Sequence, residues 1–245
     1  MKILITGSSG FIGFHLSKLL LEKGNQVHGV DSINNYYDVG LKKARLKILK
    51  KYKNFSFSKT NLENSKKIKN IFEKFKPRIV IHLAAQAGVR YSIDKPRVYL
   101  KSNIDGTFNV IESSHKIKVK HLIMASSSSV YGANKAIPFK EIDKTETQLS
   151  IYAATKKANE SMAHAYSNIW KIPITMLRFF TVYGPWGRPD MALFKFTKGI
   201  LKNKKIDIYN YGKMYRDFTY IDDIVNGITL LINKAPNEKQ RNKYK

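Results

Sequence analysis

A glycine-rich stretch near the start of the chain, Gly7-Ser8-Ser9-Gly10-Phe11-Ile12-Gly13, joins a short apolar strand to an amphipathic helix. The strand is expected over Lys2–Thr6, and the helix over residues 10–23, where apolar residues recur at helical spacing. Glycines in such a turn let backbone amides approach a pyrophosphate closely, and the helix N-terminus adds a favourable dipole. The strand–turn–helix setting therefore predicts a dinucleotide-binding site.

Strands and helices continue to alternate beyond this turn. Further strands are expected at Gln26–Asp31 and at residues 55–60, 78–85, 121–126 and 174–180. Further helices are expected at residues 41–52, Ser65–Phe75, residues 96–116 and Ile151–Trp170. This alternation is typical of a parallel sheet with helices on both faces. The fold class predicted is α/β, with a Rossmann-type, doubly wound parallel sheet.

The pattern becomes irregular after about residue 183. A helix is expected near residues 193–201, a strand near residues 206–209 and a last helix at residues 222–233. We therefore expect two parts, a Rossmann domain with the catalytic residues over 1–183 and a small C-terminal lobe over 184–245.

Asp31 closes the second expected strand, 18 residues after Gly13. A carboxylate at this place accepts hydrogen bonds from the ribose hydroxyls of a dinucleotide and repels a 2′-phosphate, which predicts NAD rather than NADP. The alternative is that Asp31 only caps the strand end. Asn61 and Leu62 end the third strand, where a contact with adenine is expected.

The composition limits the classes of protein that fit. Of 245 residues, 43% are hydrophobic, which excludes a wholly disordered chain. The absence of cysteine excludes disulfides, thiolate catalysis and cysteine-ligated metals, and the 6 histidines show no metal-ligand spacing, so no metal is expected. No apolar run reaches the roughly 18 residues of a membrane span. The first seven residues do not resemble a signal peptide, so a soluble, cytoplasmic protein is expected.

The net charge of +26 has two interpretations, a polyanion-binding surface or solvated lysine faces. The basic residues are densest between Lys42 and Lys53, a run that includes Arg45. No nucleic-acid-binding motif accompanies them, so solvated faces are favoured and nucleic acid is not expected as a partner. The scarcer arginines carry more information, because their planar fork suits phosphate and carboxylate. Four of them lie in motif-like segments: Arg90, Arg178, Arg188 and Arg216.

Tyr152 and Lys156 lie four residues apart, on one face of an expected helix. An ammonium near a phenol favours the phenolate and lowers the tyrosine pKa from about 10, which supplies a base near neutral pH. The run Ser126-Ser127-Ser128-Ser129 ends the preceding strand, at the edge where doubly wound sheets bind ligands. Such a set fits reversible oxidation of an alcohol, with hydride passing to a nicotinamide. The alternative for each serine is that it satisfies backbone groups at the strand end.

Together these features resemble the extended short-chain dehydrogenases/reductases of the nucleotide-sugar type. The resemblance is strongest to the UDP-glucuronate 4-epimerases of capsule and lipopolysaccharide synthesis. The matching stretches cover nearly the whole chain: residues 7–13, Tyr36-Tyr37-Asp38, 82–92, 126–132, 152–156, 178–191 and 216–220. The combination is specific for the superfamily and fairly specific for the subgroup.

The resemblance implies roles for particular residues. The catalytic hydroxyl falls on Ser127, the base on Tyr152 and its electrostatic partner on Lys156. The cofactor side comprises Gly7, Gly10, Phe11, Ile12, Gly13, Asp31, Asn61, Leu62, Leu83, Ala84, Ala85, Asn103, Tyr152 and Lys156. The substrate side comprises Arg90, Ser128, Ser129, Thr181, Arg188, Met191, Tyr209 and Arg216. Within that set, Tyr209 is expected beside uracil, Arg216 at the diphosphate and Arg188 at the sugar carboxylate. Alternatively, Arg188 lies in a surface loop, Arg90 in an ion pair and Tyr209 in the core.

The implied reaction oxidises C4 of a UDP-sugar with bound NAD, rotates the 4-keto sugar and returns the hydride to its other face. The expected activity is that of an isomerase converting UDP-glucuronate to UDP-galacturonate for polysaccharide biosynthesis. Related sugar 4,6-dehydratases carry an acidic pair after the catalytic hydroxyl, where Ser128 and Ser129 stand here. Three alternatives stay open: a 4-epimerase acting on another UDP-hexose or UDP-N-acetylhexosamine, an inactive NAD-binding fragment, or a nucleic-acid-binding protein.

Two departures from the family pattern stand out. Asn61 occupies a position where the resemblance predicts Asp, although its carbonyl can still accept from an adenine amino group. The chain of 245 residues is also shorter than the family's usual length of more than 300, so the nucleotide-sugar-binding lobe over residues 184–245 is expected to be partial. The family usually forms homodimers, here through the helices at residues 96–116 and Ile151–Trp170.

Overall fold

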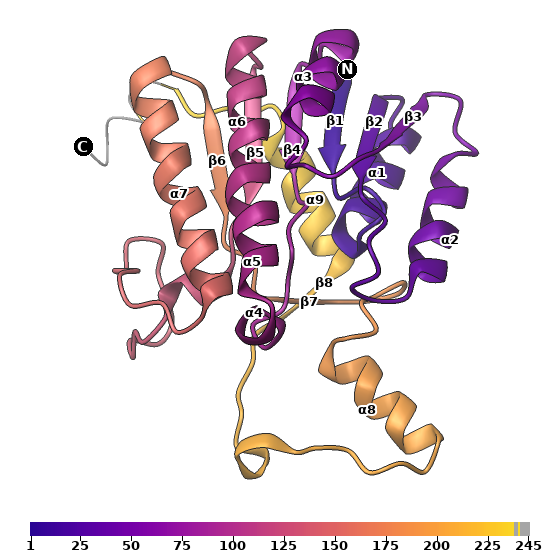
Figure 1. Ribbon diagram of the computed structural model, residues 1–245, viewed down its shortest axis with the longest axis vertical. Helices are drawn as coiled ribbons and strands as arrows, with labels where there is room; N and C mark the ends of the chain where they lie inside the picture. Colours follow the sequence, from indigo (N-terminus) through magenta and orange to yellow (C-terminus); the bar gives the residue numbers. More distant parts are fainter. Residues whose placement is uncertain (238–239, 241–245) are drawn as a thin grey trace.

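A six-stranded parallel sheet in the order β3-β2-β1-β4-β5-β6 forms the centre of the molecule (Figure 1). The computed structural model describes residues 1–237 and 240, with Tyr209 described by its backbone alone. The strands are β1 (Lys2–Thr6), β2 (Gln26–Asp31), β3 (Phe55–Lys59), β4 (Ile79–His82), β5 (His121–Ala125) and β6 (Ile174–Leu177). The chain reverses its direction of travel across the sheet between β1 and β4. Such a reversal opens a ligand crevice at the carboxyl ends of the strands.

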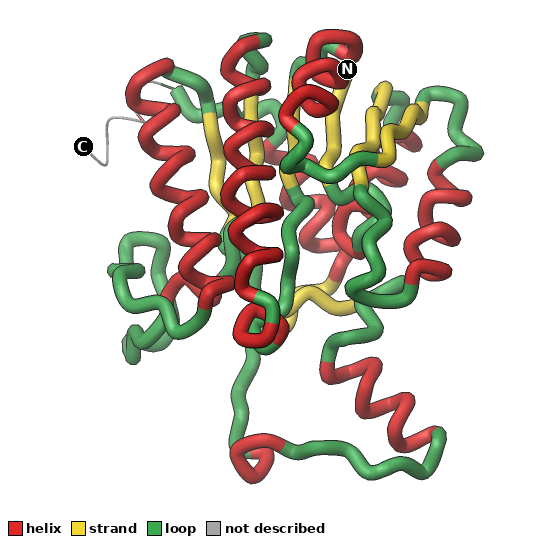
Figure 2. Tube along the Cα trace, in the orientation of Figure 1, coloured by secondary structure: helices red, strands yellow, loops and turns green. Residues whose placement is uncertain are grey.

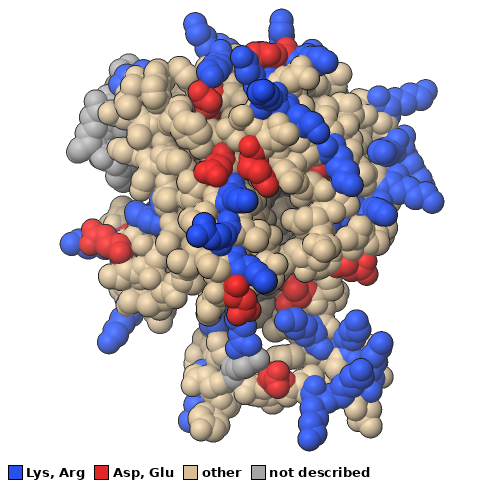
Figure 3. Space-filling model, in the orientation of Figure 1, with Lys and Arg blue, Asp and Glu red and all other residues tan. Residues whose placement is uncertain are grey.

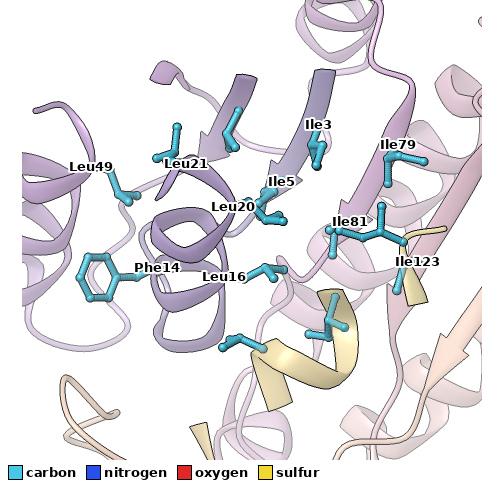
Figure 4. Packing of buried hydrophobic residues seen from close by; sticks show 14 of the residues in the cluster. Ile3, Ile5, Phe14, Leu16, Leu20, Leu21, Leu49, Ile79, Ile81 and Ile123 are labelled. Carbon is cyan, nitrogen blue, oxygen red and sulfur yellow. The ribbon is translucent and has the colours of Figure 1, made fainter. Parts of the chain in front are cut away.

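Helices cover both faces of the sheet because side chains along each strand alternate in direction. Ile3 and Ile5 of β1 pack toward α1 (Phe11–Glu22) and α9 (Ile221–Leu231), as Figure 4 shows for the side facing α1. Leu4, between them, packs into the other core. That second core lies under α3 (Ser65–Phe75), α6 (Gly106–Lys116) and α7 (Ile151–Trp170). The remaining long helix near the sheet, α2 (Val39–Leu49), packs against α1. The predicted α/β, doubly wound parallel fold is confirmed.

Helix α9 returns from the C-terminal part of the chain to the first core. Its buried residues Ile221, Val225 and Ile228, followed by Ile232, recur at helical spacing and join the cluster built on β1 and α1. Residues 221–232 therefore complete the packing of the Rossmann sheet. None of the helices within residues 1–237 and 240 is long and apolar enough to span a membrane.

The segment between the core and α9 extends below the sheet as an arm (Figure 2). Two short strands, β7 (Thr181–Tyr183) and β8 (Phe218–Tyr220), pair in parallel at its base. Between them lie α8 (Ala192–Leu201), with no buried residue, and a turn of 3-10 helix, η3 (Tyr209–Gly212). The strand expected near residues 206–209 is wrong, because this stretch has no neighbouring strand to pair with in the described structure.

Most predicted elements are present with ends shifted by a few residues. The helix expected at 96–116 is interrupted: α5 (Pro96–Tyr99) and α6 are joined by a π-helical turn, η1 (Leu100–Asp105). Five short elements were not predicted: α4 (Tyr91–Asp94), η2 (Ser128–Tyr131), β7, η3 and β8. Helix α3 has the predicted limits because the Asn64 side chain caps its start, accepting from Lys67 N at 3.0 Å, and Lys76 ends it in a left-handed conformation.

Candidate active site

A cavity of about 610 Å³ opens at the carboxyl ends of the parallel strands. Its walls come from the glycine-rich turn, the ends of β2 and β5, the start of α7 and the chain after β6. The predicted site residues that line it are Gly7, Gly10, Phe11, Ile12, Gly13, Asp31, Asn61, Leu62, Leu83, Ala84, Ala85, Ser127, Ser128, Ser129, Tyr152, Lys156, Thr181, Arg188 and Met191. The structure thus brings together segments far apart in the sequence.

The glycine-rich turn has no room for side chains. A Cβ at Gly13 would lie 2.0 Å from the Gly7 carbonyl oxygen, and one at Gly7, where φ is +76°, would lie 2.9 Å from the Ala84 nitrogen. Gly10 precedes α1 without a side-chain cap, so the amides of the first helical turn are open to an anionic ligand. Both properties suit the pyrophosphate of a dinucleotide.

Asp31 lies where the adenosine ribose of a dinucleotide is expected. Its two carboxylate oxygens accept from Ser9 N at 3.0 Å and from Ile33 N at 2.8 Å. Burial raises the pKa of this carboxyl, against the lowering effect of those two amides and of Lys42 and Arg45. A carboxylate oxygen can accept more than one hydrogen bond, so Asp31 keeps acceptor capacity for ribose hydroxyls.

Ser127, Tyr152 and Lys156 face the same cavity. The Ser127 hydroxyl is oriented by Ser129, whose backbone N–H donates to it at 3.2 Å. The Lys156 ammonium donates to the Ala125 carbonyl at 2.8 Å, and burial lowers its pKa to about 8. The Ser127 hydroxyl and the Lys156 ammonium therefore have hydrogen-bond partners within the protein before any ligand binds.

The expected lowering of the Tyr152 pKa is corrected by the structure. Burial raises this pKa above its ordinary value, and the opposing influences come from the Ser127 hydroxyl and the Arg188 charge. Lys156 does not lower it here, because its ammonium is directed to Ala125. In this state Arg188 is the cation that favours the Tyr152 phenolate.

Behind the serine run, Glu160 joins three elements. Its carboxylate accepts from the Ser126 hydroxyl at 2.6 Å and from two nitrogens of Arg178, each at 2.9 Å. Arg178 also lies over the Tyr131 ring, 5.0 Å from its centroid. Glu160 follows Lys156 by four residues, so the same helical spacing that identifies Tyr152 and Lys156 could have found it.

Asn103, predicted on the cofactor side, does not line the cavity. It is buried in η1, where its amide bonds the Gln86 backbone on both sides: Oδ1 accepts from Gln86 N at 2.8 Å, and Nδ2 donates to Gln86 O at 3.1 Å. Nδ2 also donates to Thr155 Oγ1 at 3.1 Å. Asn103 therefore holds the cavity-lining loop after β4 against the catalytic helix.

Three residues predicted on the substrate side lie outside the cavity or outside the described side chains. Arg90 is an exposed residue at the start of α4. Arg216 is exposed on the arm, where its guanidinium donates to the Tyr215 carbonyl at 2.9 Å. The side chain of Tyr209 lies outside the described residues. Arg216 is kept away because the arm points away from the sheet (Figure 1).

The structure agrees with the interpretation of the basic run as a solvated face, except at Lys42 and Arg45. Many of its lysines are exposed, and Figure 3 shows basic side chains scattered over the visible face of the molecule. Lys42 and Arg45 are nevertheless buried, at 5% and 0% exposure, because they turn inward from α2. Lys42 donates to Asn34 and lines the cavity together with Tyr36 and Tyr37. The stretch Tyr36-Tyr37-Asp38 was the sequence signal for this part of the wall.

No group of three or more His, Cys, Asp or Glu residues within the described residues could hold a metal ion. His82 is a buried histidine that lies between two threonine hydroxyls, Thr6 at 2.7 Å and Thr107 at 3.0 Å. Burial lowers its pKa to about 3, so it is neutral and holds β4 to its neighbours.

A Rossmann sheet with a glycine-rich turn and a Ser–Tyr–Lys set in one cavity defines the class of extended short-chain dehydrogenases/reductases. The chain belongs to the NAD dependent epimerase/dehydratase family, which it matches over residues 3–245. The open amides of α1, the close glycine turn and Asp31 fit NAD, the cofactor of that family.

Three proteins are similar to this chain over nearly its whole length. The chain is 57% identical over 241 residues to Protein CapI of Staphylococcus aureus, covering 98% of this chain and 72% of that protein. It is 50% identical over 241 residues to a probable UDP-glucuronate 4-epimerase of Rhizobium meliloti, covering 98% and 71%. Its fold matches UDP-glucuronic acid 4-epimerase from Bacillus cereus, solved with UDP-glucuronic acid and NAD, with a TM-score of 0.90 and 36% identity, covering 98% and 74%.

These findings confirm the predicted family resemblance, the NAD cofactor and the enzyme class, an isomerase of the UDP-sugar 4-epimerase type.

Proposed function

We propose that this protein catalyses the NAD-dependent 4-epimerisation of UDP-glucuronate to UDP-galacturonate. The observation that carries the proposal is the position of Arg188, a cation in the wall of the cavity that also holds Ser127, Tyr152 and Lys156. Ser128, Ser129 and Thr181 line the same cavity and offer hydroxyls to a carboxylate beside that cation. Asp190 already pairs with Arg188, and a sugar carboxylate would be a second anionic partner that a neutral sugar does not supply.

In the proposed reaction, the Tyr152 phenolate accepts the proton of the C4 hydroxyl, and the Ser127 hydroxyl orients the C4 oxygen. NAD held by the glycine-rich turn and Asp31 would supply the redox chemistry, as acceptor and then donor of the C4 hydride, on opposite faces of the sugar. Tyr152 then gives the proton back to the C4 oxygen. The product is an isomer of the substrate, so no net oxidation occurs and no second substrate is needed.

Lys156 has two proposed roles. Its ammonium binds the hydroxyls of the nicotinamide ribose, and its charge supports the phenolate of Tyr152 once the ammonium turns from Ala125. The remaining cofactor contacts are proposed for the turn and strand-end residues that line the cavity. They are Gly7, Gly10, Phe11, Ile12, Gly13, Asp31, Asn61, Leu62, Leu83, Ala84 and Ala85. Asn103 supports this side indirectly through the Gln86 backbone.

Of residues 184–245, predicted as a nucleotide-sugar lobe after a catalytic Rossmann domain over 1–183, we propose that role only for the arm before α9, because α9 packs into the Rossmann core. Met191 lines the cavity, which supports a proposed contact with the nucleotide. Contacts of Tyr209 with uracil and of Arg216 with the diphosphate are proposed on family resemblance. Arg216 would contact the diphosphate only after the arm moves toward the cavity.

The test is NMR of the purified protein with NAD and UDP-glucuronate, following the anomeric signals of UDP-galacturonate. Product formation by the wild type, with loss of at least 100-fold in Tyr152→Phe, is the expected result. Tyr52→Phe removes a hydroxyl far from the cavity and serves as the matched control. Turnover of UDP-glucose in preference to UDP-glucuronate would replace the proposal with a neutral-sugar epimerase. NAD binding without turnover of either sugar would indicate an inactive fragment.

We also propose that the protein is a cytoplasmic homodimer, joined through the helices at residues 96–116 and α7. The support is a set of exposed apolar side chains on these helices: Leu100, Phe108, Ile169 and Trp170. Sedimentation analysis should give a dimer that Leu100→Asp converts to a monomer. Leu230→Asp, on exposed α9 surface, should leave the dimer intact. A monomeric wild type at micromolar concentration would contradict this assembly.

A further inference from the structure

Arg188 does not stand alone in the cavity wall. Two residues later, Asp190 binds one edge of its guanidinium: Arg188 Nε donates to Oδ1 at 3.1 Å, and Nη2 donates to Oδ2. Both side chains are largely buried, at 24% and 20% exposure. Burial acts to raise the pKa of Asp190, but the hydrogen bonds and charge of Arg188 lower it overall. The pair is therefore fully ionised near neutral pH.

A third residue fixes the acidic partner. The Tyr36 hydroxyl, from the loop after β2, donates to Asp190 Oδ2 at 3.2 Å. Tyr36 itself has little freedom, because its ring packs against Tyr91 at 5.0 Å between centroids and its hydroxyl lies against Gly88, where a Cβ would come within 2.2 Å. Tyr36 lines the cavity, so the three residues form a unit at its wall.

This unit leaves the Nη1 side of the Arg188 guanidinium available to a ligand. A guanidinium carries five N–H donors in a planar fork, and Asp190 occupies the edge formed by Nε and Nη2. The Tyr36 hydroxyl also makes a hydrogen-bond contact with the guanidinium, and within the described part of the chain Nη1 itself donates to no protein acceptor. The second edge of the fork, Nη1 with Nη2, matches a second carboxylate bound side by side.

The Asp190 contact also determines where the fork points. A long arginine side chain loses much rotamer freedom when it is held in one orientation, and Asp190 has already imposed that loss before any ligand arrives. Arg188 additionally lies close enough to Tyr152 to favour its phenolate. A displaced guanidinium would therefore weaken the carboxylate contact and disturb the base.

We propose that Asp190 and Tyr36 are positioning residues that hold Arg188 as a two-pronged receptor for the sugar carboxylate, so that the unit of three residues sets the preference for a uronate over a neutral hexose. This inference rests on the proposed function. It adds that the preference depends on two residues that do not themselves bind the carboxylate.

The test measures dissociation constants by calorimetry for UDP-glucuronate, UDP-glucose and UDP on the NAD-loaded protein. The variants are Asp190→Asn and Tyr36→Phe. The ratio of the UDP-glucose constant to the UDP-glucuronate constant is the informative quantity, since general damage to the fold weakens both ligands alike. We expect this ratio to fall about 10-fold in Asp190→Asn and about 3- to 5-fold in Tyr36→Phe, while UDP binding changes less than about 2-fold.

The matched control variants remove a similar hydroxyl and a similar carboxylate charge at positions outside the unit of Tyr36, Arg188 and Asp190. Tyr52→Phe removes a tyrosine hydroxyl that donates to the carboxylate of Glu22, at the C-terminal end of α1, at 2.9 Å. Asp223→Asn neutralises an exposed carboxylate on α9. Both should leave the ratio unchanged. The mild Tyr36→Phe variant keeps the proposal testable if Asp190→Asn does not fold.

The possible results distinguish the positioning role of Asp190 and Tyr36 from the proposed function. A wild type that prefers UDP-glucuronate, with variants that retain the wild-type ratio, overturns the positioning role and leaves the proposed function standing. Tighter binding of UDP-glucuronate by Asp190→Asn also overturns it, since Asp190 would then compete with the substrate. A wild type that prefers UDP-glucose, or binds neither sugar, overturns the proposed function and this inference together.

Discussion

Replacement of Arg45 by methionine should destabilise the protein, although Arg45 belongs to a lysine-rich helix, α2. The side chain is fully buried and donates to four oxygens: Ser9 O at 3.1 Å, Tyr37 Oη at 2.9 Å, Trp186 O, and Gly187 O at 3.1 Å. These oxygens belong to the glycine-rich turn, to the loop after β2 and to the loop that carries Arg188. One guanidinium thus joins the cofactor side of the cavity to the substrate side.

The magnitude follows from two opposing effects. Hydrogen bonds from a charged donor contribute about 1.5–3 kcal/mol each, so four of them set an upper bound of roughly 6–12 kcal/mol. Removing the buried charge also removes its desolvation penalty, which destabilises the wild-type fold by several kcal/mol, and methionine fills part of the vacated volume. We expect a net loss of about 2–4 kcal/mol in the free energy of unfolding, or about 5–15 °C in Tm for a chain of this size.

Urea unfolding followed by circular dichroism measures this loss. Arg45→Lys should recover less than half of it, because an ammonium cannot reach all four oxygens. Lys47→Met places the same apolar side chain at an exposed position of the same helix and should change stability by less than about 0.5 kcal/mol. A loss below about 1 kcal/mol in Arg45→Met would refute the argument that these four contacts hold the loops together.

Three further predictions concern the turn, the lysine and the buried ion pair. Gly13→Ala places a Cβ 2.0 Å from the Gly7 carbonyl oxygen, so NAD affinity in a fluorescence titration should fall at least about 10-fold; unchanged affinity would show that the turn relaxes freely. Burial lowers the pKa of Lys156 to about 8, so below pH 8 the charged ammonium destabilises the folded state. Lys156→Met should therefore be inactive, but its free energy of unfolding at pH 7 should be higher by about 1–3 kcal/mol. That gain should shrink as the pH rises from 8 towards 10.5, and a variant less stable than wild type at pH 7 would contradict it. Burial acts to raise the pKa of Glu160, but the hydrogen bonds and charge of Arg178 lower it overall. The Glu160–Arg178 pair therefore stabilises the folded state fully at pH 7, and this stabilisation is lost as the pH falls through the pKa of Glu160 in the folded state. Glu160→Gln should thus cost about 2–4 kcal/mol at pH 7 and less below about pH 4, and a penalty independent of pH would exclude this ionic origin.

Features with short-range causes could be predicted from the sequence. The period of apolar residues located α1, α3 and α7, because each buries one face against the sheet. The glycine-rich turn and Asp31 could be found because strand, turn and acidic residue have a fixed spacing. Tyr152 and Lys156 could be found because a helix places residues four apart on one face.

Features that depend on distant contacts could not be predicted. Arg45 belongs to a lysine-rich helix, and only the loop containing Trp186 and Gly187, about 140 residues later, explains why it turns inward. The direction of the Lys156 ammonium depends on the Ala125 carbonyl. The expected strand near residue 206 illustrates the opposite error, since local β propensity does not form a strand without a partner.

The position of α9 bears on the order in which the chain can fold during synthesis. Ile221, Val225 and Ile228 fill the core built on β1 and α1, although about 200 residues separate these segments in the sequence. A ribosome adds about 5–20 residues per second, so the first strand and helix wait roughly 10–40 seconds for the residues that cover them. During that interval the apolar face of the nascent sheet is open to chaperones, and a transcript broken before codon 221 would yield a polypeptide with that face uncovered.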